Sequence, residues 1–362
     1  MGPLPSTGRI GSRPTMRDVA ALAGVSLKTV SRVVNGEPGV SAATSRRVMA
    51  AADELSFRLD LGARSLRRAD RRTATIGVVL EDLDNPFSSA LHRAVENVAR
   101  RRGVAVLAGS LDEDPVRERE LVAAFSSRRV DGLVIMPTDT DHSYLELERR
   151  AGTPLVFVDR MPNQIEADVV LTDNREGARA GVAHLISAGH RHVGFLGDLI
   201  RIATARDRHA GFLDAMRAAG LPTSERDAVH DASTVETADA ATTALLSTAD
   251  PPTALFTAQN LVTIGALHAL RRLDRQREVA LVGFDDFQLA DLLDPPVTVV
   301  AQDPHTIGRS AAEHLFRRMD GDQSPYVTEV VPTRLVPRGS GEIPPPGRSG
   351  ALTARPRQAT AG

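Results

Sequence analysis

Three histidines lie close together in the sequence, and histidine clusters can bind a transition metal. Neither the spacing of His184, His190 and His192 nor a neighbouring carboxylate matches a zinc motif such as His-Glu-x-x-His. The chain has no cysteine, which excludes thiolate catalysis and cysteine-bound zinc, and it contains no G-x-S-x-G elbow or G-x-x-x-x-G-K phosphate loop. We therefore expect no metal, no cofactor and no enzymatic activity, and we interpret the histidines as structural residues of a helix-to-strand turn.

The charge of the chain is distributed very unevenly. The first 72 residues contain 13 Lys and Arg against 6 Asp and Glu, a net charge of +7, whereas the remaining 290 residues carry −9. Cations placed near phosphates release counterions and gain affinity, so a basic terminal module suits a nucleic acid as its partner. Composition alone is equally consistent with a basic, solvated tail. The secondary structure of this segment therefore has to decide between a nucleic-acid-binding module and a solvated tail.

The segment 15–55 predicts three short helices around a small shared core. Thr15, Ser26 and Ser41 each precede a helical stretch and can cap free backbone N–H groups. Gly24 permits the tight turn of a helix-turn-helix between the first two helices. The predicted core consists of apolar residues at helical spacing, namely Val19, Ala20, Ala23, Val30, Val33, Val48 and Leu55.

After Arg72 the pattern changes to short apolar runs that alternate with amphipathic stretches, which is typical of βαβ units and parallel sheets. The clearest strands are expected at 75–80, 104–108, 132–136, 155–158, 169–172, 193–196, 254–256 and 280–284. Helices are expected between them, for example at 89–101, 175–188, 208–219 and 261–273. So many units fit two doubly wound lobes better than one sheet, with a ligand held between the lobes at the carboxyl ends of the strands.

Composition also indicates the compartment and the domain limits. The 362 residues are 42% hydrophobic but contain no apolar run long enough to span a membrane, and the first fourteen residues lack the apolar stretch of a signal peptide. We expect a soluble, cytoplasmic protein associated with the nucleoid. The predicted domains are a disordered tail at 1–14, a headpiece at 15–59, a hinge at 60–72, a sensor at 73–340 and a disordered tail at 341–362.

The run MRDVAALAGVSLKTVSRVVN, residues 16–35, closely resembles the headpiece of the lac-repressor (LacI/GalR) family. The resemblance continues to about residue 338 through RSL at 64–66, NPF at 85–87, DGL at 131–133, GHRHVGF at 189–195, GF at 211–212 and GFDD at 283–286. It implies a fold of the α + α/β class: a three-helix helix-turn-helix headpiece, a hinge helix, and a two-lobed, doubly wound sensor like the periplasmic binding proteins.

The resemblance also implies that the second helix enters the major groove of DNA, where each base pair shows a distinct pattern of donors and acceptors. Leu27, Lys28 and Arg32 match the base-reading positions, and Arg32 can donate two hydrogen bonds to guanine. Lys28 is the only lysine in a chain that otherwise uses arginine, although a single lysine can also survive by chance. Contacts with phosphates, which set register without reading sequence, are expected from Ser26, Thr29, Ser31 and Asn35.

Residues 60–68 match the family's hinge helix, which folds on operator DNA. Leu66 matches the leucine that enters the minor groove at the centre of the site, where an apolar wedge unstacks a base step and kinks the duplex. The alternative is that Leu66 is the apolar face of an ordinary linker helix. The family usually has Tyr, Pro and Asn where this chain has Phe57, Leu59 and Asp60, so the start of the hinge stays open.

In the sensor, Asp159, Arg208 and Asp285 match the family's ligand-contacting positions. Carboxylates and a guanidinium that converge on one space can each bind two adjacent hydroxyls, as a sugar requires. For Arg208 the alternative is a salt bridge between the lobes. The family usually has an acid at position 260 and an aromatic near 231–234, and this chain has neither. The remaining candidates for effector binding are Gln259, Asn260, Asn85, Phe87 and Gln302.

Three classes of function remain: a ligand-controlled DNA-binding regulator, a sugar-binding protein of a transport system, and an enzyme of doubly wound fold. A transport protein would need a secretion signal and would lack the headpiece, and an enzyme would need one of the motifs that the chain lacks. We expect a transcriptional regulator, by family analogy a repressor, that binds pseudo-palindromic operator DNA as a homodimer and responds to a sugar or a related metabolite without any membrane partner.

Overall fold

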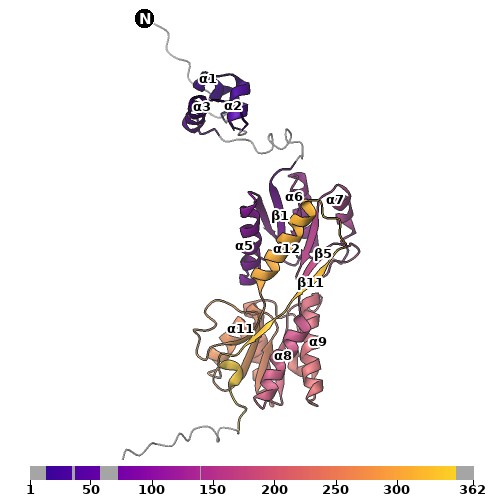
Figure 1. Cartoon of the computed structure of the whole chain (residues 1–362). Coiled ribbons are helices and arrows are strands. Elements are labelled where there is room, and N and C mark those ends of the chain that lie inside the picture. Colours follow the sequence, from indigo (N-terminus) through magenta and orange to yellow (C-terminus); the bar gives the residue numbers. More distant parts are fainter. Residues whose placement is uncertain (1–13, 35–36, 58–71, 139, 348–362) are drawn as a thin grey trace, which may run out of the picture. The chain divides into compact units, whose positions relative to one another are not determined.

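The computed structural model describes residues 14–34, 37–57, 72–138 and 140–347. The chain divides into two compact units, residues 1–73 and 74–362, which are described separately below. Figure 1 shows the helices of the first unit and the two sheets of the second. In the described residues, no helix is long and apolar enough to cross a membrane.

The first unit is the three-helix headpiece that the sequence predicts. Its described helices are α1 (Met16–Ala23), α2 (Leu27–Val34) and α3 (Ala42–Glu54). The hydroxyl residues begin them as expected: Thr15 bonds the Asp18 carboxylate at 2.7 Å, and the Ser41 hydroxyl accepts the Thr44 N–H at 3.2 Å. The core of this unit is small, and its fully buried side chains are Val19, Val30 and Val48.

The second unit contains two lobes, each built on a six-stranded sheet. Lobe 1 has the strand order β11-β5-β4-β3-β1-β2, and all its pairings are parallel. Helices α5 and α12 pack together on one face of the sheet, and α6 covers the other (Figure 1). The strands and helices are β1 (Thr75–Leu80), α5 (Pro86–Arg101), β2 (Ala105–Ser110), α6 (Pro115–Ser127), β3 (Leu133–Ile135), α7 (Glu146–Arg150), β4 (Leu155–Val158), β5 (Asp168–Thr172), α12 (Pro304–Met319) and β11 (Thr328–Val331).

Lobe 2 has the strand order β12-β10-β9-β8-β6-β7, in which only β12 runs antiparallel to its neighbour. The paired helices α8 and α9 cover one face, and the pair α10 and α11 covers the other. The strands and helices are α8 (Asn174–Ser187), β6 (Val193–Leu196), α9 (Ala203–Ala218), β7 (Ala228–Val229), α10 (Val235–Leu246), β8 (Ala254–Thr257), α11 (Asn260–Arg272), β9 (Ala280–Phe284), β10 (Thr298–Ala301) and β12 (Arg334–Val336).

The chain crosses between the lobes three times, after β5, after β10 and after β11. Two of the crossings are tied to each other, because the Thr333 N–H donates to the Asp173 carboxylate at 2.7 Å. Parallel strands of both sheets therefore end near these crossings. This is the position in which doubly wound sheets bind ligands.

The predicted strands all exist, with ends that shift by one or two residues. Two helices begin three or more residues earlier than predicted. Helix α5 starts at Pro86, because Asn85 caps it, and α9 starts at Ala203 rather than at 208. The residues before Arg208 are compatible with a helix, so no residue type marks the later start. The segments 115–127, 235–246 and 304–319 form further helices, which are not among the four named in the sequence analysis.

The predicted boundary of the C-terminal tail at Gly341 is wrong for the residues that the structure describes. The segment Ser340–Glu342 forms a 3-10 helix, and Ser340 and Gly341 are buried. The Ser340 hydroxyl donates to the Leu281 carbonyl at 2.6 Å, and the Ile343 carbonyl bonds the His190 ring at 2.8 Å. These polar contacts hold a Gly- and Pro-rich segment against lobe 2 without any apolar pattern that the sequence could reveal.

Candidate functional site

The turn between α1 and α2 sets the orientation of the second helix. Gly24 ends α1 in the left-handed conformation at φ 63°, and its N–H bonds the carbonyls of Ala20 and Ala21. Two residues later, the Ser26 hydroxyl accepts the Thr29 N–H at 3.1 Å and begins α2. Val30 is buried against the other helices, so the opposite side of α2 faces outward.

The outward side of α2 carries the predicted base-reading residues. Leu27, Lys28 and Arg32 are exposed, and the ion pair described between Arg32 and Glu37 is loose, at 3.7 Å. Lys28 and Arg32 are four residues apart and thus share one face of the helix. A short helix with a cationic outer face can enter the major groove.

Some of the other predicted DNA-binding residues lie within the described part of the chain, and some do not. Ser26 and Thr29 bond each other through their hydroxyls at 2.9 Å, at the start of α2. Asn35 and Leu66 lie outside the described residues, as does the hinge segment 60–68, and their roles remain predictions.

Arg208 is the best-connected of the predicted effector residues. Its guanidinium is buried, donates to Asn174 Oδ1 at 2.7 Å and to the Ala258 carbonyl at 2.8 Å, and lies 3.6 Å from the Asp285 carboxylate. It also stacks over the Phe284 ring, 4.0 Å from the centroid. All these partners belong to lobe 2 elements, so the alternative of a salt bridge between the lobes does not describe it.

Asp285 follows β9 directly, in a left-handed conformation at φ 70° that turns it out of the strand. Its carboxylate accepts a hydrogen bond from Gln302 Nε2 at 2.6 Å, which brings two predicted residues together. The Gln302 Oε1 atom is buried and has no hydrogen-bond partner. Burial raises the pKa of Asp285, and Arg208 opposes that shift.

Asp159 occupies the equivalent place in lobe 1. It follows β4 with φ 68° and lies 3.3 Å from the Nε atom of Arg160. Arg160 is held by two hydrogen bonds to the Glu113 carboxylate, at 2.6 and 2.9 Å, and Glu113 also accepts the Thr138 hydroxyl at 2.8 Å. The Nε of Arg160 is buried and makes no hydrogen bond.

Asn85 and Asn260 meet across the two lobes. Asn260 Nδ2 donates to Asn85 Oδ1 at 2.9 Å, and Asn85 Nδ2 donates to Asn260 Oδ1 at 3.4 Å. A second contact joins the lobes nearby, where Arg201 donates to the Glu113 carbonyl at 3.2 Å. Effector candidates from both sheets are therefore close together.

Two predicted residues have mainly local roles in this structure. The Gln259 side chain caps α11 by accepting the N–H groups of Leu261 and Val262, at 2.7 and 3.2 Å. Phe87 is half-buried and packs against the core of lobe 1. Neither side chain forms a described hydrogen bond with the side chain of another candidate, although the Phe87 backbone N–H donates to Asn85 Oδ1 at 3.0 Å.

Acidic side chains from both lobes gather around this centre. Burial raises the pKa of Glu81 to about 8, with Arg160 opposing the shift and Glu113 and Asp198 adding to it. Burial also raises the pKa of Asp198, which follows β6 in lobe 2. The carboxylates thus outnumber the arginines that neutralise them, and a ligand that enters meets acceptors on both sides.

The sequence reasoning missed Arg160, Glu113, Glu81, Asp198 and Asn174. Each follows or flanks the carboxyl end of a strand, as Glu81 follows β1 and Asp198 follows β6. That position is a usable signal in a doubly wound sheet. The three histidines are apart from this centre and have separate partners: His184 bonds Glu342, His190 bonds Thr253, and His192 pairs with Asp227.

Comparison with known proteins agrees with this organisation. Residues 15–59 match the family described as bacterial regulatory proteins, lacI family, and residues 182–341 match a periplasmic binding protein-like domain. The HTH-type transcriptional regulator MalR of Streptomyces coelicolor is 32% identical over 336 residues, which cover 90% of this chain and 96% of that protein.

Two solved structures are similar over both units. A structure of the lac repressor dimer bound to operator and the anti-inducer ONPF has a TM-score of 0.78 at 26% identity, and covers 91% of this chain and 99% of that one. A transcriptional regulator CelR–cellobiose complex has a TM-score of 0.67 at 30% identity, and covers 91% and 100%.

A helix-turn-helix headpiece joined to a periplasmic-binding-protein-like sensor defines a DNA-binding transcriptional regulator. The chain belongs to the lacI family of bacterial regulatory proteins. The three relatives described above cover 90% or more of this chain, and each is named as a transcriptional regulator or a repressor.

We predict that Glu81→Gln changes how the stability of the sensor depends on pH. Folded protein keeps Glu81 protonated up to about pH 8, whereas the unfolded chain loses that proton near its ordinary pKa of 4.5. The folded state therefore binds the extra proton between these values, and stability falls as pH rises through the window. In calorimetry, the variant should match the wild type near the lower limit and melt at a higher temperature than the wild type near the upper one.

The control for this prediction is Glu120→Gln, because Glu120 is exposed on α6. The melting temperature of Glu120→Gln should differ from that of the wild type by the same amount at both ends of the pH window. A Glu81→Gln effect that stays constant across the window would contradict the raised pKa.

Proposed function

We propose that this regulator is a repressor that binds pseudo-palindromic operator DNA as a homodimer, with an operator affinity set by a small polar effector, a sugar or a sugar derivative. Asn85, Asp159, Arg208, Asn260 and Asp285 would hold the effector, with Gln302 orienting Asp285. The hinge 60–72 would transmit the response, and Leu66 would enter the minor groove.

The observation that carries the proposal is the buried polar centre at the strand ends of the two lobes. Asp285, Arg208 and Asn260 come from lobe 2, and Asn85 and Asp159 come from lobe 1. Buried carboxylates and amides offer both acceptors and donors, and a polyol can satisfy them with its hydroxyls. The solved relative with cellobiose bound supports a sugar as the ligand class.

Repression is supported by the solved relative that is named a repressor and is bound to operator with an anti-inducer. A bound repressor excludes polymerase simply by occupying the promoter, so it needs no activating surface. We propose the same direction of control here.

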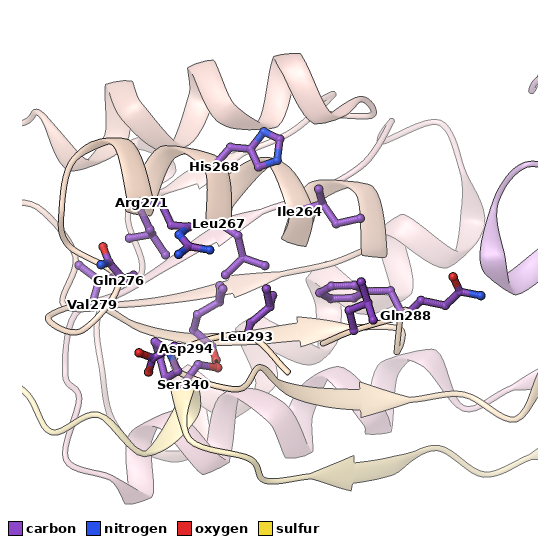
Figure 2. Close-up of a pocket in the computed structure, with 15 residues that line it drawn as sticks. Ile264, Leu267, His268, Arg271, Gln276, Val279, Gln288, Leu293, Asp294 and Ser340 are labelled. Carbon is purple, nitrogen blue, oxygen red and sulfur yellow. Dashed lines mark hydrogen bonds between the residues drawn. The ribbon is translucent and has the colours of Figure 1, made fainter. Parts of the chain in front are cut away.

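An exposed apolar patch on lobe 2 supports the homodimer. Ile264 and Leu267 on α11 and Leu293 after β9 point into one pocket of about 370 Å³ (Figure 2). Leu289, which also lines the pocket, is 64% exposed, and the neighbouring Leu292 is 73% exposed. Projecting leucines next to an apolar pocket form a self-complementary patch, because the leucines of one copy can fill the pocket of a second copy related by a two-fold axis.

We predict that Lys28→Ala and Arg32→Ala lower affinity for the specific DNA site more than for random DNA. The loss should be about 1–3 kcal/mol for Arg32, since a bidentate contact with guanine is lost. The site is first selected by the protein from a randomised duplex library, and affinities are then measured by fluorescence anisotropy at one salt concentration.

The matched control is Arg46→Ala, which removes an equal charge from the exposed surface of α3. It should weaken binding to both DNAs to a similar extent. An Arg32→Ala variant that loses equal affinity for both would show that Arg32 contacts phosphate and does not read a base.

For the dimer, we predict that Leu292→Asp dissociates the protein into monomers at micromolar concentration. The reason is that an unpaired carboxylate in an apolar interface loses its hydration without gaining a partner. Sedimentation velocity measures the change, and Val116→Asp is the control, since Val116 is equally apolar and 64% exposed but lies on α6 of lobe 1. A Leu292→Asp protein that remains dimeric would remove the lobe 2 patch from the interface.

The effector site is tested by Asp285→Asn. An effector is first found by screening sugars and sugar derivatives for a rise in melting temperature, which a ligand of the folded state produces. We predict that the variant binds operator within about twofold of the wild type without effector and no longer responds to it, because a buried acceptor pair for hydroxyls is lost. Asp286→Asn is the control, because the Asp286 side chain pairs with Arg338 instead. An Asp285→Asn protein that keeps the full response would contradict the assigned site.

A further inference from the structure

Two of the candidate effector residues form hydrogen bonds with each other. Asn85 precedes α5 in lobe 1 and is 6% exposed, while Asn260 begins α11 in lobe 2 and is 1% exposed. Their amides bond reciprocally, at 2.9 and 3.4 Å. The two residues are 175 positions apart in the sequence and belong to different lobes, so the contact exists only while the lobes lie this close together.

Each amide is also fixed by its own helix. Asn85 Oδ1 accepts the Phe87 N–H at 3.0 Å, and Asn260 Oδ1 accepts the Leu261 N–H at 2.7 Å. A carbonyl oxygen has two lone pairs, so each oxygen bonds its helix and still has a site for the opposite amide. The two side chains are therefore held in a fixed orientation, which lowers the entropy lost when they pair.

The acidic side chains at the boundary between the lobes oppose closure, unlike the amide pair. Glu113 in lobe 1 raises the pKa of Asp198 in lobe 2, and both carboxylates raise the pKa of Glu81 in lobe 1. Like charges brought together oppose the closed arrangement. A neutral amide pair adds attraction at the same boundary without adding charge.

We propose that the Asn85–Asn260 pair is a clasp that holds the two lobes closed in the effector-free protein. The pair makes, within the protein, the kind of bridge between lobes that a hydroxyl of the effector would make. This inference rests on the proposed function for the identity of the site. The clasp itself is a property of the effector-free chain and can be tested without any ligand.

The clasp also gives Asn260 a specific role. A carboxylate at this position would accept hydrogen bonds but donate none, so it could not form the reciprocal pair. An effector that replaces the clasp has to donate to one amide and accept from the other, which a hydroxyl does and a phosphate does not. The clasp thus regulates entry to the site and favours a hydroxyl at this point of the effector.

The experiment measures the separation of the lobes in the full-length chain without effector. The chain has no cysteine, so Glu120→Cys on α6 and Arg217→Cys on α9 place one spin label on each lobe at exposed positions. Labelled chains are mixed with an excess of unlabelled chains, so that each pair of labels reports on one molecule. Pulsed electron spin resonance then gives the distribution of distances.

The test variants are Asn85→Ser and Asn260→Ser. Serine keeps an acceptor for the helix N–H but is too short to bond across the lobes. Asn97→Ala on the outer part of α5 is the matched control, because the one hydrogen bond described for the Asn97 side chain is from Arg100 on the same helix. If either serine variant is unfolded by circular dichroism, Asn260→Asp replaces it, since it keeps the shape and removes the donor of the 2.9 Å bond.

We expect one short distance for the wild type and for Asn97→Ala, and an additional longer distance for each clasp variant. The ratio of open to closed molecules should rise about 5- to 30-fold, the effect of losing a pair of buried hydrogen bonds. Distributions that do not change in either clasp variant would overturn the clasp, as would a wild type that is mostly open. Neither result would affect the effector site, which the melting-temperature screen tests independently.

Discussion

The buried guanidinium of Arg208 joins three elements of lobe 2 at one point. A charge removed from water has to be paired and hydrogen-bonded, or its desolvation destabilises the fold. Arg208 meets this requirement by bonding the start of α8 through Asn174, the end of β8 through Ala258, and the turn after β9 through Asp285. Three elements that are far apart in the sequence are thereby fixed at one point. Removing one of these acceptors leaves the buried cation with one partner fewer.

The sequence predicted the headpiece and the class of the sensor well, because both depend on local signals. Hydroxyl caps, Gly24 and helical spacing define three helices, and apolar runs define the strands. The sequence did not reveal contacts that depend on distant partners. Glu113 meets Arg160 only after β2 and β4 have joined one sheet, and nothing near Ser340 shows that Leu281 will bind it. The start of the hinge lies outside the described residues, so that boundary remains a prediction.

At the boundary between the lobes, some polar interactions oppose closure and others favour it. The carboxylates of Glu113 and Asp198, which face each other from the two lobes, disfavour closure, whereas the amides of Asn85 and Asn260 favour it. A protein that balances the two can change its lobe arrangement in response to a small ligand, because only the difference in affinity for the two arrangements matters. Such a balance is what a sensor requires, and a rigid binding protein would not need it.

The central claim is that effector and operator act on one shared equilibrium of this chain. Linkage then requires each ligand to change the affinity of the other by the same factor, typically about 5–150-fold. The most direct measurement is therefore calorimetric titration of the identified effector into wild-type protein, once alone and once saturated with the selected operator. We expect effector affinities that differ by the same factor by which effector changes operator affinity, as linkage requires. Identical effector affinities in the two titrations would contradict it, even if both ligands bind.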